Sequence, residues 1–134
     1  MSTSTTGFND AAADAAIDQI ISGGVTVHLL GGGDTLNYSD GSTEISNKSD
    51  AQVSVAAADL SISSPADFSG VTTLSNDNEL DFGSPNIGVV DDIVIQSDSN
   101  ADRAIRANEP DNPDLTGENV TIPVGTTLYE LGNP

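Results

Sequence analysis

The sequence predicts an all-β fold, an antiparallel β-sandwich or jelly roll with one N-terminal α-helix. Two observations carry this prediction: short apolar or alternating runs recur after residue 24, and turn-forming Gly, Asn, Asp and Pro residues separate them. The chain has 134 residues, which is enough for one domain with its own core. We therefore expect a flexible N-terminal arm over residues 1–7 and a single sandwich domain over residues 8–134.

One segment has the periodicity of a helix, and it precedes all the strands. Asn9 is a favourable N-cap residue, and Asp10 in the first turn suits the positive end of the helix dipole. Apolar residues recur on one face, acids recur every four residues on another, and Gly23-Gly24 ends the pattern. The sequence therefore predicts a helix over residues 9–22.

The remainder of the chain predicts about seven short strands, as expected of a sandwich. Val25–Leu30 is expected to be largely buried, and Val89–Ile95, apolar apart from two acids, is the strongest strand. A long loop is expected over Ala107–Gly117, and a closing hairpin is expected at the end of the chain, turning at residues 123–125. The other predicted strands are Gln52–Ala56, Val71–Leu74, Asn78–Phe82, Val120–Ile122 and Thr127–Leu131.

The charge balance excludes several classes of function. Twenty-one acidic residues against three basic ones give a formal net charge of −18. Such a chain has no basic surface for nucleic acid, and an anionic membrane surface would repel it. No apolar run approaches the roughly 20 residues of a membrane-spanning helix, and the polar N-terminus predicts no signal peptide. We therefore expect neither nucleic acid nor membrane among its partners.

The kind of acidity indicates the solvent in which the protein works. Sixteen of the acids are Asp, a single Lys is present, and the acids are spread from Asp10 to Glu130. Molar salt shortens the screening length to about 3 Å, so a surface crowded with carboxylates becomes tolerable. The composition therefore predicts a halophilic protein. A solvated acidic interaction tail is the alternative, and the even spread of the acids argues against it.

The sequence contains no pattern that predicts catalysis. His28 is the only histidine and lies within a predicted strand, and no nucleophile-elbow pattern accompanies it. Gly31–Gly33 follows a strand as phosphate-binding loops do, but no Walker lysine follows, so we expect a turn. Without cysteines, the chain can form neither disulfides nor thiol nucleophiles. We therefore predict that the protein is not an enzyme.

One acidic segment matches the ligand spacing of a calcium loop. It places oxygen ligands at positions 1, 3, 5 and 12 of an EF-hand-type loop, yet position 6 is Arg103 instead of Gly, and a strand and a proline flank it instead of helices. We expect a solvated acidic hairpin loop, with a structural cation as the alternative and no other cofactor. The candidate ligands are Asp98, Asn100, Asp102 and Glu109.

Several short motifs follow one another in a definite order. The predicted helix passes through Gly23-Gly24 into a strand that reads Val-Thr-Val-His-Leu-Leu. Further on, Leu74-Ser-Asn leads to Glu-Leu-Asp-Phe82. Gly88 then opens the central strand, and the segment Val120–Leu131 closes the chain. This order resembles a family of small structural proteins encoded in the virion-gene clusters of tailed bacteriophages and archaeal viruses. The resemblance covers most of the chain. Members often carry Trp-Gly before the central strand, where this chain has Ile-Gly.

The resemblance implies a small, non-enzymatic virion protein that acts by assembly, and the acid surplus points to a haloarchaeal tailed virus. We expect an accessory head component, a capsid turret or decoration subunit. A tail or baseplate component and, in another class, an acidic DNA-mimic inhibitor are the alternatives. The protein would be assembled in the host cytoplasm into the virion, as a homo-oligomer in contact with other capsid or tail proteins. The residues expected at the assembly interface, unless they merely close the sandwich, are Phe8, Ile17, Ile20, Ile21, Leu128, Tyr129 and Leu131.

Overall fold

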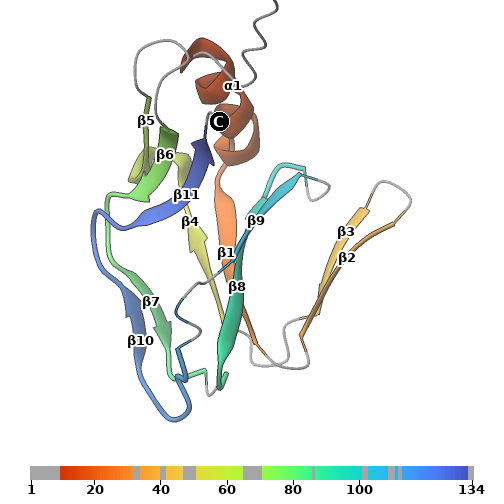
Figure 1. Ribbon diagram of the computed structural model, residues 1–134, viewed down its shortest axis with the longest axis vertical. Helices are drawn as coiled ribbons and strands as arrows, with labels where there is room; N and C mark the ends of the chain where they lie inside the picture. Colours follow the sequence, from red (N-terminus) through yellow and green to blue (C-terminus); the bar gives the residue numbers. More distant parts are fainter. Residues whose placement is uncertain are drawn as a thin grey trace, which may run out of the picture.

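The computed structural model confirms an all-β, sandwich-like fold with one leading helix (Figure 1). It describes residues 10–31, 34–39, 42–46, 51–64, 71–85, 87–100, 103–108, 111 and 113–132. The helix α1 spans Asp10–Ile21, and a single 3₁₀ turn, η1, spans Ala57–Asp59. The strands are β1 (Val25–Gly31), β2 (Thr35–Ser39), β3 (Ser42–Ser46), β4 (Gln52–Val55), β5 (Leu60–Ser63), β6 (Val71–Asn76), β7 (Leu80–Gly83), β8 (Val90–Ser97), β9 (Ala104–Asn108), β10 (Val120–Ile122) and β11 (Thr127–Gly132).

The segments predicted as strands are strands in the structure, and their ends move by at most a few residues. The predicted helix is also present, although the arm before it and the expected N-cap Asn9 lie outside the described residues. Four strands were not predicted: β2, β3, β5 and β9. No helix in the described ranges has the length and apolar character needed to cross a bilayer.

The larger sheet has the order β4-β1-β8-β9, with every neighbouring pair antiparallel. Its register aligns Val53, Val27, Ile95 and Ile105 in one row across the four strands. Because side chains alternate along a strand, this row and its neighbours two residues away form one apolar face. That face packs against the second layer of the sandwich.

The second layer consists of the sheet β11-β6-β5 and the pair β10-β7. The prediction of a closing hairpin is wrong, because β10 and β11 do not pair with each other. Instead, β10 pairs with β7 and β11 pairs with β6. The segments β6–β7 and β10–β11 therefore both run from the β11-β6-β5 sheet to the β10-β7 pair. Figure 1 shows β7 and β10 below β6 and β11.

A single buried amide holds this corner together. Asn76 is 1% exposed, and its Nδ2 donates to the carbonyl oxygens of Asn78 at 2.8 Å and of Pro123 at 2.9 Å. The backbone carbonyl of Asn76 also accepts the N–H of Gly125 at 2.8 Å, and Gly125 has a φ of +80° that favours glycine. These bonds attach the β10–β11 turn to the end of β6, which explains why the turn does not close a hairpin.

The helix closes one end of the sandwich. Ala13, Ile17 and Ile21 recur at intervals of four, so they share one face, and all three are buried. The helix contacts β5 and β6 of one layer and β8 of the other. The core therefore extends from α1 between the layers, while the opposite end of the sandwich has no helix in the described structure (Figure 1).

Candidate functional site

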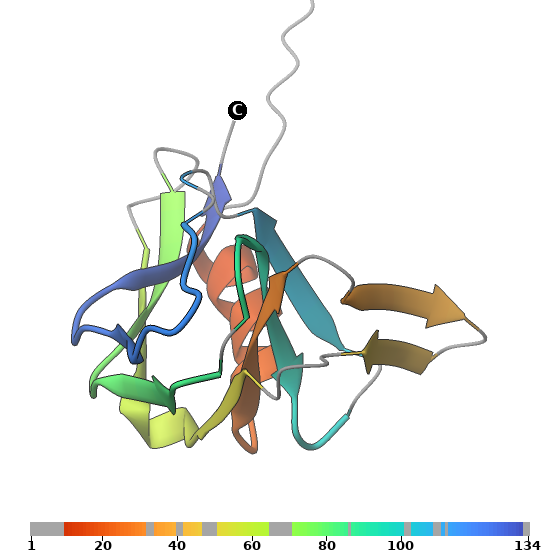
Figure 2. The same cartoon turned by 90° about the horizontal axis from the view of Figure 1, so that it is seen from below.

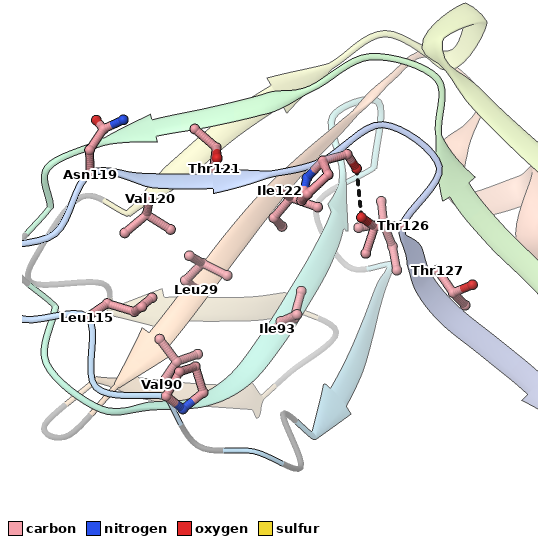
Figure 3. A pocket seen from close by; sticks show the side chains of 13 residues that line it. Leu29, Val90, Ile93, Leu115, Asn119, Val120, Thr121, Ile122, Thr126 and Thr127 are labelled. Atoms are coloured by element: carbon pink, nitrogen blue, oxygen red, sulfur yellow. Dashed lines mark hydrogen bonds between the residues drawn. The ribbon is translucent and has the colours of Figure 1, made fainter.

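A half-open cavity of about 360 Å³ lies between the layers at the end away from α1. Its floor is formed by Leu29 of β1 and Ile93 of β8, and its roof by Val120 and Ile122 of β10, whose side chains point toward one another in Figure 3. Thirteen residues line it, and none carries a charge although the chain has a net charge of −18. A cavity of this size falls at the lower end of the range of small-molecule and side-chain pockets.

An acidic segment borders one side of the cavity. Asp114 lies between Pro113 and Leu115, both of which line the cavity. Its carboxylate accepts hydrogen bonds from the Oγ1 of Thr116 at 2.7 Å and from its backbone N–H at 3.1 Å, and these bonds lower the pKa of Asp114. Glu118 follows in the same exposed segment. The cavity therefore combines an uncharged interior with an anionic rim.

The β2–β3 hairpin projects from the body on the far side of the larger sheet (Figures 1 and 2). It forms a two-stranded sheet of its own, in which Leu36 pairs with Ile45 and Tyr38 pairs with Thr43. Directly paired positions share a face, so these four positions lie on one face, and only Thr, Asn, Ser and Glu positions lie on the other. Such an isolated pair of strands is only marginally stable in water unless its apolar face is covered.

The only two basic residues in the described structure lie at the edge of the larger sheet. Arg106 of β9 bonds through Nη2 to the Oδ2 of Asp92 at 2.9 Å, and this bond and the charge of Asp92 raise the pKa of Arg106. The Arg106 side chain is nevertheless 60% exposed. Arg103 donates from Nη1 to the Oε1 of Gln19 on α1 at 2.9 Å. Two exposed guanidinium groups therefore lie at β9, one paired with Asp92 and the other bonded to Gln19.

The described part of the candidate calcium loop ties the end of β8 to the start of β1. The Oδ1 of Asp98 accepts the hydroxyl of Thr26 at 2.7 Å, and its N–H donates to the carbonyl of Gly24 at 3.0 Å. The carbonyl of Asn100 accepts the N–H of Arg103 and so closes the β8–β9 turn. Asp102 and Glu109 lie outside the described residues, and within the described ones no group of three or more acids or histidines is placed to hold a metal ion.

His28 is packed inside the larger sheet, between Gln52 of β4 and Val94 of β8. It is 6% exposed, and within the described structure neither ring nitrogen has a partner at hydrogen-bonding geometry. Burial lowers the pKa of His28, and the nearby Gln96 side chain and the charge of Asp98 oppose the shift without reversing it. The structure thus places this residue as a packed histidine that is neutral at physiological pH.

The residues predicted for an assembly interface lie within or against the core of the chain. Ile17, Ile21 and Leu128 are at most 5% exposed, and Ile20, Tyr129 and Leu131 pack partly buried against the same core, while Phe8 lies outside the described residues. Sequence reasoning missed the projecting hairpin, although Asp40-Gly41 between two alternating segments is a recognised hairpin signal. The cavity has no signal in the sequence, because its lining comes from strands far apart along the chain.

Comparisons with protein-family models, with curated proteins and with solved structures found no match for this chain. Its class is therefore defined by fold and site alone. It is a small acidic β-sandwich that is closed by a helix at one end and hollowed into an uncharged cavity at the other, with a projecting hairpin.

Proposed function

We propose that this protein is a non-enzymatic structural component of the virion of a halophilic tailed virus. The station we favour is an accessory head position, as a capsid turret or decoration subunit. The observation that carries the proposal is the order of elements. The elements α1, β1, β7, β8 and the β10–β11 end occupy the segments whose motifs resemble the virion proteins, in the same order along the chain.

The arrangement of apolar surface supports a role in assembly. A domain of this size needs its apolar residues for its own core, yet the chain places apolar positions on a projecting hairpin and leaves an apolar cavity open. Such features are expected where copies or neighbouring proteins complete the packing, and symmetric repetition makes weak contacts durable. We infer a homo-oligomer that contacts other capsid proteins.

The charge supports a saline setting for this assembly. At a net charge of −18, copies repel one another over about 10 Å at 0.1 M salt, but over only about 3 Å at molar salt. Molar salt also strengthens apolar contacts when its ions are excluded from protein surfaces. Assembly through uncharged surfaces is therefore compatible with the solvent that the composition indicates.

The proposal is tested on virions purified from the host that carries the gene. Mass spectrometry is expected to find this chain in the particle in many copies, at a ratio to the major capsid protein set by the symmetry of the shell. Gold-labelled antibody on intact particles is expected to decorate heads, whereas decoration of tails would support the tail alternative. Absence of the chain from particles, while it is abundant in infected cells, would refute the proposal.

A further inference from the structure

We propose that two copies of this protein pair about a two-fold axis, with the turn at residues 123–126 of each copy placing Val124 in the half-open cavity of the other. The inference rests on the proposed function, because it supplies a contact for the homo-oligomer proposed there. Three features of the described residues carry it: an exposed apolar side chain on a rigid turn, an incompletely filled cavity beside that turn, and the lack of charged side chains in both.

The turn after β10 presents an apolar side chain to solvent on a backbone that is held in place. Val124 is 62% exposed and lies outside the cavity lining, although its neighbour Pro123 is part of that lining. The Pro123 carbonyl accepts the Nδ2 of Asn76 at 2.9 Å, and the Oγ1 and N–H of Thr126 at 2.6 and 3.3 Å. Figure 3 shows the hydroxyl bond of Thr126 as a dashed line. A turn that is fixed in this way loses little conformational entropy when a partner covers its exposed side chain.

The cavity beside the turn has room for that side chain. It measures about 360 Å³, whereas a cavity of about 150 Å³ is large enough to hold benzene, which is bulkier than the side chain of valine. Ile93, Leu115 and Ile122 line the cavity and are only half-buried. An inserted valine would therefore remove its own surface and theirs from water, which is favourable in proportion to the apolar area covered.

A projection and a hollow that adjoin each other on one patch favour pairing with a second copy of the same chain. In a two-fold contact, residue i of one copy meets residue j of the other, and j meets i. Pro123 and Thr126, before and after Val124 along the chain, both line the cavity, so projection and hollow share one patch. Of the three large apolar side chains that are exposed in the described part of the chain, two adjoin this cavity: Val124, and Val89 next to a lining residue of β8.

The distribution of charge favours this patch for contact between copies. Residues 119–129 and the cavity lining contain no charged side chain, although 24 of the 134 residues are charged, 3 basic and 21 acidic. Two copies with a net charge of −18 each repel one another least where uncharged surfaces meet. Asp114 and Glu118 are exposed on one side of the cavity, so they would lie at the rim of the contact, where molar salt screens them. The dimer is therefore expected at molar NaCl and should weaken as the salt concentration falls.

The first test measures mass by light scattering at molar NaCl, on variants whose folding is checked by circular dichroism. The wild type is expected to be a dimer whose mass does not rise further with concentration, because a two-fold contact closes on itself. Val124→Asp should raise the dissociation constant about tenfold or more, because a carboxylate would enter the uncharged cavity, whereas Val124→Leu should still pair. Val71→Asp is the matched control, because Val71 is exposed on β6 outside the cavity lining. A mass that grows beyond the dimer, or a Val124→Asp variant that pairs as the wild type does, would overturn the contact.

The second test uses the fact that the chain has no cysteine. Val124→Cys is mixed at molar NaCl with tagged Asn119→Cys, whose position is exposed and lines the cavity (Figure 3), and a bis-maleimide is added. We expect the mixed cross-linked dimer to form about tenfold or more faster than with tagged Asp18→Cys on the exposed face of α1, because binding raises the effective concentration of the paired thiols. Equal rates in the two mixtures would refute the pairing of Val124 with the cavity.

The outcomes separate this inference from the proposed function. A dimer that meets both tests, together with absence of the chain from virions, retains the contact and refutes the virion role. A wild-type chain that is monomeric at molar NaCl refutes the contact even if the chain is found in virions. If that monomer binds a neutral apolar dye in the cavity, the occupant is a small molecule instead of a second copy.

Discussion

Substituting Asn76 tests whether one buried amide holds the corner of the second layer. Its Nδ2 donates to the carbonyls of Asn78 and Pro123, and through the second bond it connects β6 to the β10–β11 turn. Its Oδ1 is buried without a partner in the described structure. Asn76→Ala removes the two donors and also this unsatisfied acceptor, whereas Asn76→Asp removes the donors and leaves oxygen facing both carbonyls.

The magnitudes follow from these contacts. Each hydrogen bond contributes a net stability of about 0.5–1.5 kcal/mol, and the small void left by the side chain adds to the loss. Removing the unsatisfied Oδ1 of Asn76 offsets part of this loss of stability. We therefore expect Asn76→Ala to lower the free energy of unfolding by about 2 kcal/mol. Asn76→Asp should cost about 3 kcal/mol or more, because a buried carboxylate would face two carbonyl oxygens.

The assay is urea unfolding at constant molar NaCl, followed by circular dichroism. Asn78→Ala is the matched control: Asn78 is exposed and accepts only through its backbone carbonyl, so the change should stay within about 0.5 kcal/mol. The reasoning is refuted if both Asn76 variants are as stable as the control. It is equally refuted if Asn76→Asp is no less stable than Asn76→Ala.

Three further predictions follow from the fold. Burial lowers the pKa of His28 below its ordinary value of 6.5, so the unfolded chain takes up the proton at a higher pH than the folded chain does. The free energy of unfolding should therefore fall as the pH drops below about 6.5, and His28→Gln should flatten this dependence. Urea unfolding should show stability rising steeply from about 0.1 M to molar NaCl, and a salt-independent unfolding free energy would contradict the halophilic interpretation. Gly31→Ala would place its Cβ 2.7 Å from the carbonyl oxygen of Val89, so thermal melts should show the free energy of unfolding lowered by about 2 kcal/mol or more. Gly117→Ala is the comparison: its Cβ meets open space, and its positive φ alone should lower the free energy of unfolding by about 1 kcal/mol.

The elements that the sequence predicted are those whose pattern is local. β1 and β8 have long apolar runs, and α1 has one apolar face that ends at a glycine pair, so each signal is complete within its own segment. β9 was missed because Ala-Ile-Arg-Ala-Asn contains one strong strand former, and pairing with β8 across a short turn determines its conformation. β5 alternates Leu-Ser-Ile-Ser, so its signal was present although too short to stand out.

Pairing partners are less accessible to sequence reasoning than strands. Val120–Ile122 and Thr127–Leu131 are separated by a turn-forming segment, which locally favours a hairpin. Asn76, nearly fifty residues earlier, binds that segment and directs the two strands into different sheets. Burial also depends on residues far along the chain. The apolar character of Ile17 and Leu128 therefore did not show whether the chain's own core or a second copy covers these side chains.

The acidity and the cavity are connected by one physical requirement. A chain with 24 charged residues, 21 of them acidic, presents nearly uniform repulsion to its own copies, so any contact between copies must use the surface that the acids leave free. The thirteen uncharged residues of the cavity provide such a surface. Salt then acts in the same direction on both levels of structure, because it screens the carboxylates that oppose folding and those that oppose assembly. We therefore expect the solvent that stabilises the monomer to be the one in which the proposed assembly through uncharged surfaces becomes favourable.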